Sequence, residues 1–180
     1  YDEHVYIFSL TSMINICKKY DFEVFDIKYL NTAGGSLRYY IARKNMYKKT
    51  ENYLDCEKIE NNINLFDIDI YSKFKKDCEE SKYKLLNALM NEKNKNKVIA
   101  GYGATSKSTT IFNYCNIGTD LVDYITDTTP TKINKLSPGK HIPICDYEYY
   151  LNNLPDCIYL LAWTHKDEIM KKEKNNYQGK

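Results

Sequence analysis

The sequence lacks any long apolar run and any strong excess of charge. Over its 180 residues, no segment approaches the roughly 18–20 apolar residues that a membrane-spanning helix needs, and no secretory signal peptide is visible. Lys and Arg number 26 and Asp and Glu 24, which gives a net charge of +2. A dedicated nucleic-acid binder normally shows a concentrated basic face. We therefore expect neither a membrane nor a nucleic acid as partner, although a phosphate pocket needs only one or two cations.

The sequence also lacks a C-x-x-C pair, although it contains six cysteines. Such pairs are typical of zinc sites, so we expect no metal site within this chain. Scattered thiols without a signal peptide indicate reduced cysteines and a cytoplasmic location. Tyrosine, in contrast, occurs 18 times. We attribute this abundance to A/T-rich codons and not to function.

The first part of the chain predicts a helix and then two antiparallel strands. Apolar residues recur at helical spacing over residues 9–19, where Ser9 is suited to cap the N-terminus. Residues 22–30 and 36–43 are rich in β-branched and aromatic side chains, with turn residues between them.

Residues 51–93 contain neither Gly nor Pro, and their apolar residues recur at near-helical spacing. They predict one or two helices with a break around 61–67. Residues 91–97 predict a charged, solvated connection, to which we assign no function.

From Val98 onward, short apolar segments alternate with helical ones. The expected strands are 98–100, 121–126, 142–144 and 157–162, and the expected helices are 105–114, 146–153 and 165–175. Such alternation is typical of a parallel sheet covered on both faces, and right-handed crossovers then give a Rossmann-like half. The predicted fold class is therefore α/β, with a Rossmann-like parallel-sheet domain preceded by a helical connection.

Two short segments in the first part carry polar groups suited to chemistry. Tyr1, Glu3 and His4 place three proton-handling groups within four residues. His has an ordinary pKa of about 6.5, which suits proton removal at neutral pH. A polar loop before a helix explains the same residues without a function. The second segment consists of Gly34, Gly35, Ser36 and Arg38. Its glycine backbone, its hydroxyl and its positive charge could bind an anionic ligand. A plain hairpin turn also explains these residues.

A third segment lies between the first expected strand and helix of the second part. We expect its first four residues to form a turn: Gly101, Tyr102, Gly103 and Ala104. Free N–H groups at such a helix start attract phosphate, and Lys107 adds a positive charge. The segment is neither a Walker A loop nor a complete dinucleotide fingerprint, because Ser106 stands at a required glycine. Asp127 nevertheless resembles the acid that binds an adenosine ribose, so an NAD-binding module stays an alternative.

Trp163 follows the last expected strand, at the edge where open α/β sheets bind ligands. Stacking on a ligand ring and an ordinary rim position explain this tryptophan equally well.

Taken in order, these segments resemble the C-terminal region of the sugar C-methyltransferase family. The matching pieces are YDEH, FSLTS, FEVFDI, GGSLRYYIARK, VIAGYGATSK, NYCNI, PGKHIPI and PDCIYLLAWTHKDEI. The resemblance implies that residues 1–46 end an S-adenosylmethionine-dependent methyltransferase domain. It further implies a helical connection over 47–96 and a C-terminal Rossmann-like substrate-binding domain over 97–180.

The resemblance also implies the chemistry. His4 would be the general base, with Glu3 and Tyr1 supporting it, and the substrate would be a nucleotide-diphosphate keto-deoxysugar. The family binds S-adenosylmethionine in its central domain and zinc in its N-terminal domain, and both sites would lie mostly upstream of Tyr1. We therefore expect this piece alone to be inactive. An NAD-binding module or a non-catalytic nucleotide-binding domain is the alternative, and the sequence leaves the oligomeric state open.

Overall fold

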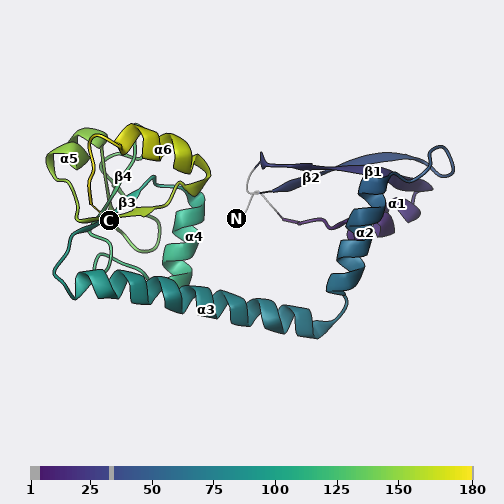
Figure 1. Cartoon of the computed structure of the whole chain (residues 1–180), viewed down its shortest axis with the longest axis horizontal. Coiled ribbons are helices and arrows are strands. Elements are labelled where there is room, and N and C mark those ends of the chain that lie inside the picture. The colour runs from purple at the N-terminus through teal and green to yellow at the C-terminus, as the bar shows by residue number, and fades with distance from the viewer. Residues whose placement is uncertain (1–4, 33–34, 180) are drawn as a thin grey trace. The chain divides into compact units, whose positions relative to one another are not determined.

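The computed structural model describes residues 5–32 and 35–179. The chain divides into two compact units, Tyr1–Asp77 and Cys78–Lys180 (Figure 1). Tyr1, Glu3, His4 and Gly34 lie outside the described residues.

The first unit is a two-stranded sheet with helices packed on it. Its elements are α1 (Leu10–Lys18), β1 (Phe22–Leu30), β2 (Ser36–Arg43), α2 (Glu51–Ile63) and the start of α3 (Ile68–Lys93). The predicted helix and antiparallel strand pair are confirmed. The predicted break is also confirmed, because Asn64 ends α2 in the left-handed conformation, with φ of 55°.

A β-bulge at Phe25 sets which side chains of β1 face the helices. The register shifts between Val24 and Asp26, so that Val24 and Ile27 both become buried although they are three residues apart. Both side chains join the core of this unit, where Leu10 of α1 and Tyr53 of α2 also pack.

The second unit contains a five-stranded sheet. Its elements are the end of α3, β3 (Ile99–Tyr102), α4 (Ser106–Cys115), β4 (Tyr124–Thr126), β5 (Lys135–Leu136), β6 (Pro143–Cys145), α5 (Tyr147–Asn152), β7 (Cys157–Leu160), a 3₁₀ turn (Trp163–His165) and α6 (Lys166–Glu173). The strand order is β5-β6-β4-β3-β7, and all pairs are parallel except β5 with β6. The predicted α/β class with a Rossmann-like sheet is confirmed.

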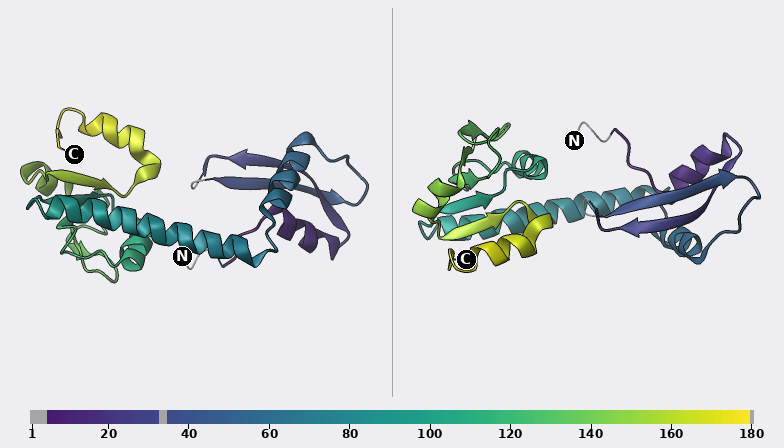
Figure 2. Two further views of the ribbon diagram at one scale, coloured as in Figure 1. Left: turned by 60° about the horizontal axis from the view of Figure 1, so that its bottom comes forward. Right: turned by 90° about the horizontal axis from the view of Figure 1, so that it is seen from above.

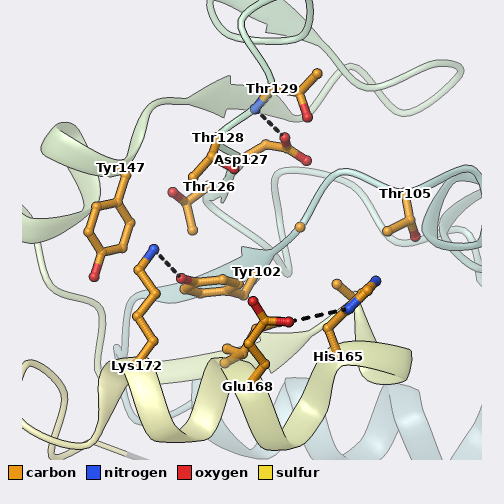
Figure 3. A pocket seen from close by; sticks show the side chains of 13 residues that line it. Tyr102, Thr105, Thr126, Asp127, Thr128, Thr129, Tyr147, His165, Glu168 and Lys172 are labelled. Carbon is orange, nitrogen blue, oxygen red and sulfur yellow. Dashed lines mark hydrogen bonds and ion pairs between the residues drawn. The ribbon is translucent and has the colours of Figure 1, made fainter.

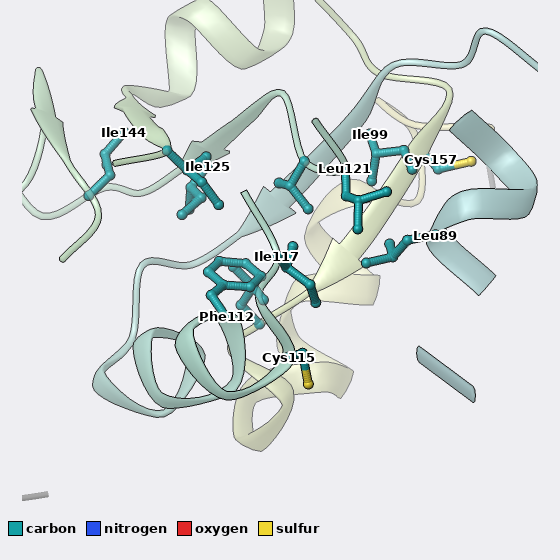
Figure 4. Packing of buried hydrophobic residues seen from close by; sticks show 12 residues of the cluster. Leu89, Ile99, Phe112, Cys115, Ile117, Leu121, Ile125, Ile144 and Cys157 are labelled. Atoms are coloured by element: carbon teal, nitrogen blue, oxygen red, sulfur yellow. The ribbon is translucent and has the colours of Figure 1, made fainter. Parts of the chain in front are cut away.

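Helices cover both faces of this sheet, as Figures 1 and 2 show. On one face, Leu89 of α3 and Phe112 of α4 pack against Ile99 and Ile125 (Figure 4). On the other face, Tyr150 of α5 packs with the alternate residues of the strands. Because side chains of a strand alternate between faces, β3 contributes to both cores.

Two local predictions for this unit are wrong, and one short strand was missed. Residues 101 and 102 belong to β3 and not to a turn, because β3 pairs with both β4 and β7 up to Tyr102. β5 was not expected, since two residues carry no periodic signal. Residues 91–97 are not simply solvated: α3 continues to Lys93, and buried Glu92 forms an ion pair with Lys97 at 2.8 Å.

Candidate functional site

A cavity of about 430 Å³ lies at the carboxyl ends of β3 and β4. Residues that follow β7 and residues of α5 and α6 complete its wall (Figure 3). In the sheet, β4 pairs with one side of β3, and β7 pairs with the other side of β3. The strand order therefore reverses direction at β3. Ligands of open α/β sheets bind at such a point of reversed strand order.

The predicted glycines of this region have different surroundings. Gly101 lies inside the sheet, where an added Cβ would come within 2.6 Å of the Leu161 side chain, so close packing explains the glycine. Gly103 lines the cavity with φ of +91°, and a Cβ there would come within 2.7 Å of Ala162. Gly103 therefore lets the loop after β3 turn closely beside the end of β7.

The polar backbone groups of Ala104 are held by two side chains from beyond β4. Its N–H donates to Asp127 Oδ2 at 2.7 Å, and its carbonyl accepts from Lys132 Nζ at 2.7 Å. Asp127 Oδ1 also accepts the N–H of Thr129 at 2.7 Å. The protein thus uses both carboxylate oxygens of Asp127 to hold the segments on either side of the cavity.

The charge of Asp127 is stabilised by these contacts. Burial raises the pKa of Asp127, but the hydrogen bonds from Thr129 and Ala104 and the charge of Lys132 outweigh it and hold the pKa below its ordinary value. The carboxylate is therefore ionised at neutral pH.

The start of α4 is capped by its own side chains. The N–H of Thr105 donates to Ser108 Oγ at 3.1 Å, and the N–H of Ser108 donates to Thr105 Oγ1 at 3.1 Å. With Ala104, three N–H groups of this segment are thus hydrogen-bonded within the protein. The two outermost predicted residues do meet: Lys107 Nζ lies 5.5 Å from the ring centre of Trp163. Neither lines the cavity.

A buried carboxylate lies behind two phenols that line the cavity, Tyr102 and Tyr147. Glu173 accepts hydrogen bonds from Tyr102 at 2.7 Å, Tyr147 at 2.9 Å and Tyr150 at 3.3 Å. Burial and the neighbouring carboxylate raise the pKa of Tyr102 and of Tyr147, so both phenols stay protonated and able to donate.

Two basic side chains of the last helical segment, Lys172 and His165, also line the cavity. Lys172 Nζ donates to the Tyr102 hydroxyl at 3.3 Å and lies 3.5 Å from the ring centre of Tyr147. His165 Nδ1 lies 3.7 Å from a carboxylate oxygen of Glu168 (Figure 3). The sequence interpretation missed these residues, although α6 begins just beyond the sheet edge where ligands bind.

In the first unit, a second cavity of about 770 Å³ lies at the loop end of the strand pair. Gly35 and Ser36 line it, together with Tyr39, whose hydroxyl donates to the carbonyl of Phe8 at 3.0 Å. Arg38 is exposed and, because side chains alternate along β2, projects from the face opposite Leu37 and Tyr39. The structure therefore brings Gly35 and Ser36 together but not Arg38.

Comparison with known proteins identifies the family. Residues 31–180 match the family described as C-methyltransferase C-terminal domain. The chain belongs to this family. C-methyltransferase NovU from Streptomyces niveus is 26% identical over 175 residues, which are 97% of this chain and 42% of that protein. The chain thus spans less than half the length of this relative.

The methyl donor expected for such a C-methyltransferase domain does not fit the loop after β3. Methyl-donor loops usually carry an acidic residue just before a longer Gly-rich turn, whereas β3 is apolar up to Tyr102 and Asp127 is already bonded to Ala104. We therefore assign no contact with the methyl donor to this loop.

Among residues 5–32 and 35–179, no group of three or more His, Cys, Asp or Glu side chains could hold a metal ion. The zinc prediction concerns a domain outside this chain and stays a prediction. In the described part of the chain, no helix is both long and apolar enough to cross a membrane. All six cysteines are free thiols.

Proposed function

We propose that this chain is the C-terminal part of an S-adenosylmethionine-dependent C-methyltransferase that acts on a nucleotide-linked keto-deoxysugar. The observation that carries the proposal is a ligand-sized cavity at the strand-order reversal of a C-methyltransferase C-terminal domain. In this proposal residues 1–46 form the end of the methyltransferase domain, residues 47–96 form a helical connection, and residues 97–180 form the substrate-binding domain. We propose that the protein acts in the cytoplasm.

The nucleotide diphosphate of the substrate occupies the cavity at the carboxyl edge of the sheet. Four threonines line that cavity: Thr105, Thr126, Thr128 and Thr129. The Thr126 hydroxyl donates to the carbonyl of Asp146 and the Thr129 side chain bonds to Asp127, so we assign donation to phosphate oxygens to the hydroxyls of Thr105 and Thr128. Lys172 supplies a positive charge there. Gly103 allows close approach of the backbone, and Lys107 and Trp163, which lie together outside the lining, stay predicted substrate-binding residues. Gly34, Gly35, Ser36 and Arg38 of the first unit stay predicted substrate-binding residues.

His4 removes a proton from the substrate. A 4-keto group makes the neighbouring C3 proton of a sugar acidic, and an imidazole with an ordinary pKa can accept it at neutral pH. Glu3 orients the imidazole, and the Tyr1 hydroxyl donates to the oxygen of the enolate that forms. S-adenosylmethionine supplies the methyl group that the enolate carbon takes.

Calorimetry on the full-length protein tests this function. We expect saturable binding of S-adenosylmethionine and of a nucleoside diphosphate, and no binding of NADH. NADH binding without any binding of the methyl donor would instead support the dinucleotide-binding alternative.

A further inference from the structure

We propose that Lys172 pairs with a phosphate of the nucleotide in the cavity, and that Glu173 is a positioning residue that acts on Lys172 through Tyr102 and Tyr147. This inference rests on the proposed function and deepens it, because it names the residues that recognise the charged part of the substrate.

Lys172 is held by aromatic side chains and not by a carboxylate. Its ammonium lies 3.5 Å from the ring centre of Tyr147 and donates to the Tyr102 hydroxyl at 3.3 Å. The contact with the ring face is a cation–π interaction, which orients the ammonium without neutralising its charge. Lys172 therefore presents an unneutralised cation to the cavity that it lines (Figure 3).

Glu173 fixes the two aromatic partners of Lys172. Glu173 is 6% exposed as a residue, and burying a carboxylate costs free energy unless hydrogen bonds satisfy it. The hydroxyls of Tyr102 and Tyr147 both donate to Oε1, at 2.7 and 2.9 Å. One buried acid thus sets the positions of both side chains on which the ammonium rests.

Neither carboxylate that lines the cavity forms an ion pair with Lys172 among the described contacts. Asp127 is bonded to Ala104, Thr129 and Lys132. The Glu168 side chain is 83% exposed, so solvent screens its charge. An arriving phosphate therefore meets the ammonium together with threonine hydroxyls, a donor set typical of phosphate sites.

The test compares charged and uncharged ligands on the full-length protein. Thymidine, uridine, cytidine and guanosine diphosphates and the four matching nucleosides are titrated calorimetrically. Lys172→Met should weaken binding of the preferred diphosphate roughly 10- to 100-fold, the usual range for a charged hydrogen bond, and leave nucleoside binding unchanged. Lys171→Met, at the exposed neighbouring position, is the matched control and should bind both as the wild type does.

Positioning by Glu173 has its own readout. Glu173→Gln and Tyr147→Phe should each weaken diphosphate binding several-fold more than nucleoside binding, whereas Tyr150→Phe, which removes the longest of the three bonds, should not. Tyr147→Phe provides the test if Glu173→Gln does not fold. Unchanged diphosphate affinity in Lys172→Met would overturn the inference and leave the proposed function standing. A wild-type protein that binds no nucleoside diphosphate would overturn both.

Discussion

At the scale of residues, several tyrosines have specific structural roles that the composition did not suggest. Tyr102, Tyr147 and Tyr150 converge on Glu173, and a composition count cannot separate these residues from the rest of the 18 tyrosines. The contact between Tyr102 and Glu173 joins positions 71 residues apart. No local pattern predicts such a pair.

His4 offers the sharpest prediction for a single residue. In the full-length protein, His4→Ala should lower turnover roughly 10²- to 10⁴-fold, because a general base typically contributes that much. Binding of S-adenosylmethionine, measured by calorimetry, should stay unchanged.

His141→Asn is the matched control for that experiment. His141 is exposed and has φ of 55°, a conformation that Asn also tolerates, so its turnover should stay near that of the wild type. Near-normal turnover of His4→Ala would remove His4 from the mechanism.

At the scale of elements, the sequence predicted those parts whose signals are local. Helix periodicity placed α1, and strand composition placed β1 and β2. The carboxyl end of β3 was mistaken for a turn because Gly101 and Gly103 are turn-forming residues in isolation. Pairing with β4 and β7 overrides that preference up to Tyr102.

The loop from β3 to α4 leads to a pH-dependent prediction. Because the pKa of Asp127 is lowered in the folded state, its contribution to stability is present above the unfolded pKa of about 4 and is lost as the pH falls through the lower folded value. Asp127→Asn should lower the free energy of unfolding of this chain by about 1–3 kcal/mol at pH 7. Urea denaturation should show this difference shrinking as the pH falls below about 4.

Asp120→Asn serves as the control, since Asp120 lies on the exposed surface of the same unit. If the difference in free energy of unfolding between Asp127→Asn and the wild type stays constant from pH 7 to pH 3, the ionised Asp127 carboxylate does not stabilise the fold through its bond to Ala104.

At the scale of the whole molecule, the strand order creates the cavity. β7 adds beside β3 and opposite β4, so the ends of three strands and the start of α6 meet at one edge. Of the predicted site residues, Tyr102 and Gly103 line this cavity, while Lys107 and Trp163 lie together outside its lining.

The length of the chain predicts its activity in isolation. The chain aligns with 42% of NovU, and in the proposed function the methyl-donor site lies upstream of Tyr1. Residues 1–180 alone should therefore transfer no methyl group from labelled S-adenosylmethionine to a nucleotide-linked keto-deoxysugar. The full-length protein under the same conditions is the positive control, and transfer by the isolated chain would show that the donor site is misplaced.

The sequence by itself determined the α/β class, the strand pair, the break between α2 and α3, and the family resemblance, because periodicity, turn residues and short motifs act over a few neighbouring positions. Only the tertiary structure decided that Asp127 holds Ala104 and that Lys172 rests on Tyr102 and Tyr147. Those contacts depend on strand order and helix packing, which bring together side chains that are distant along the chain.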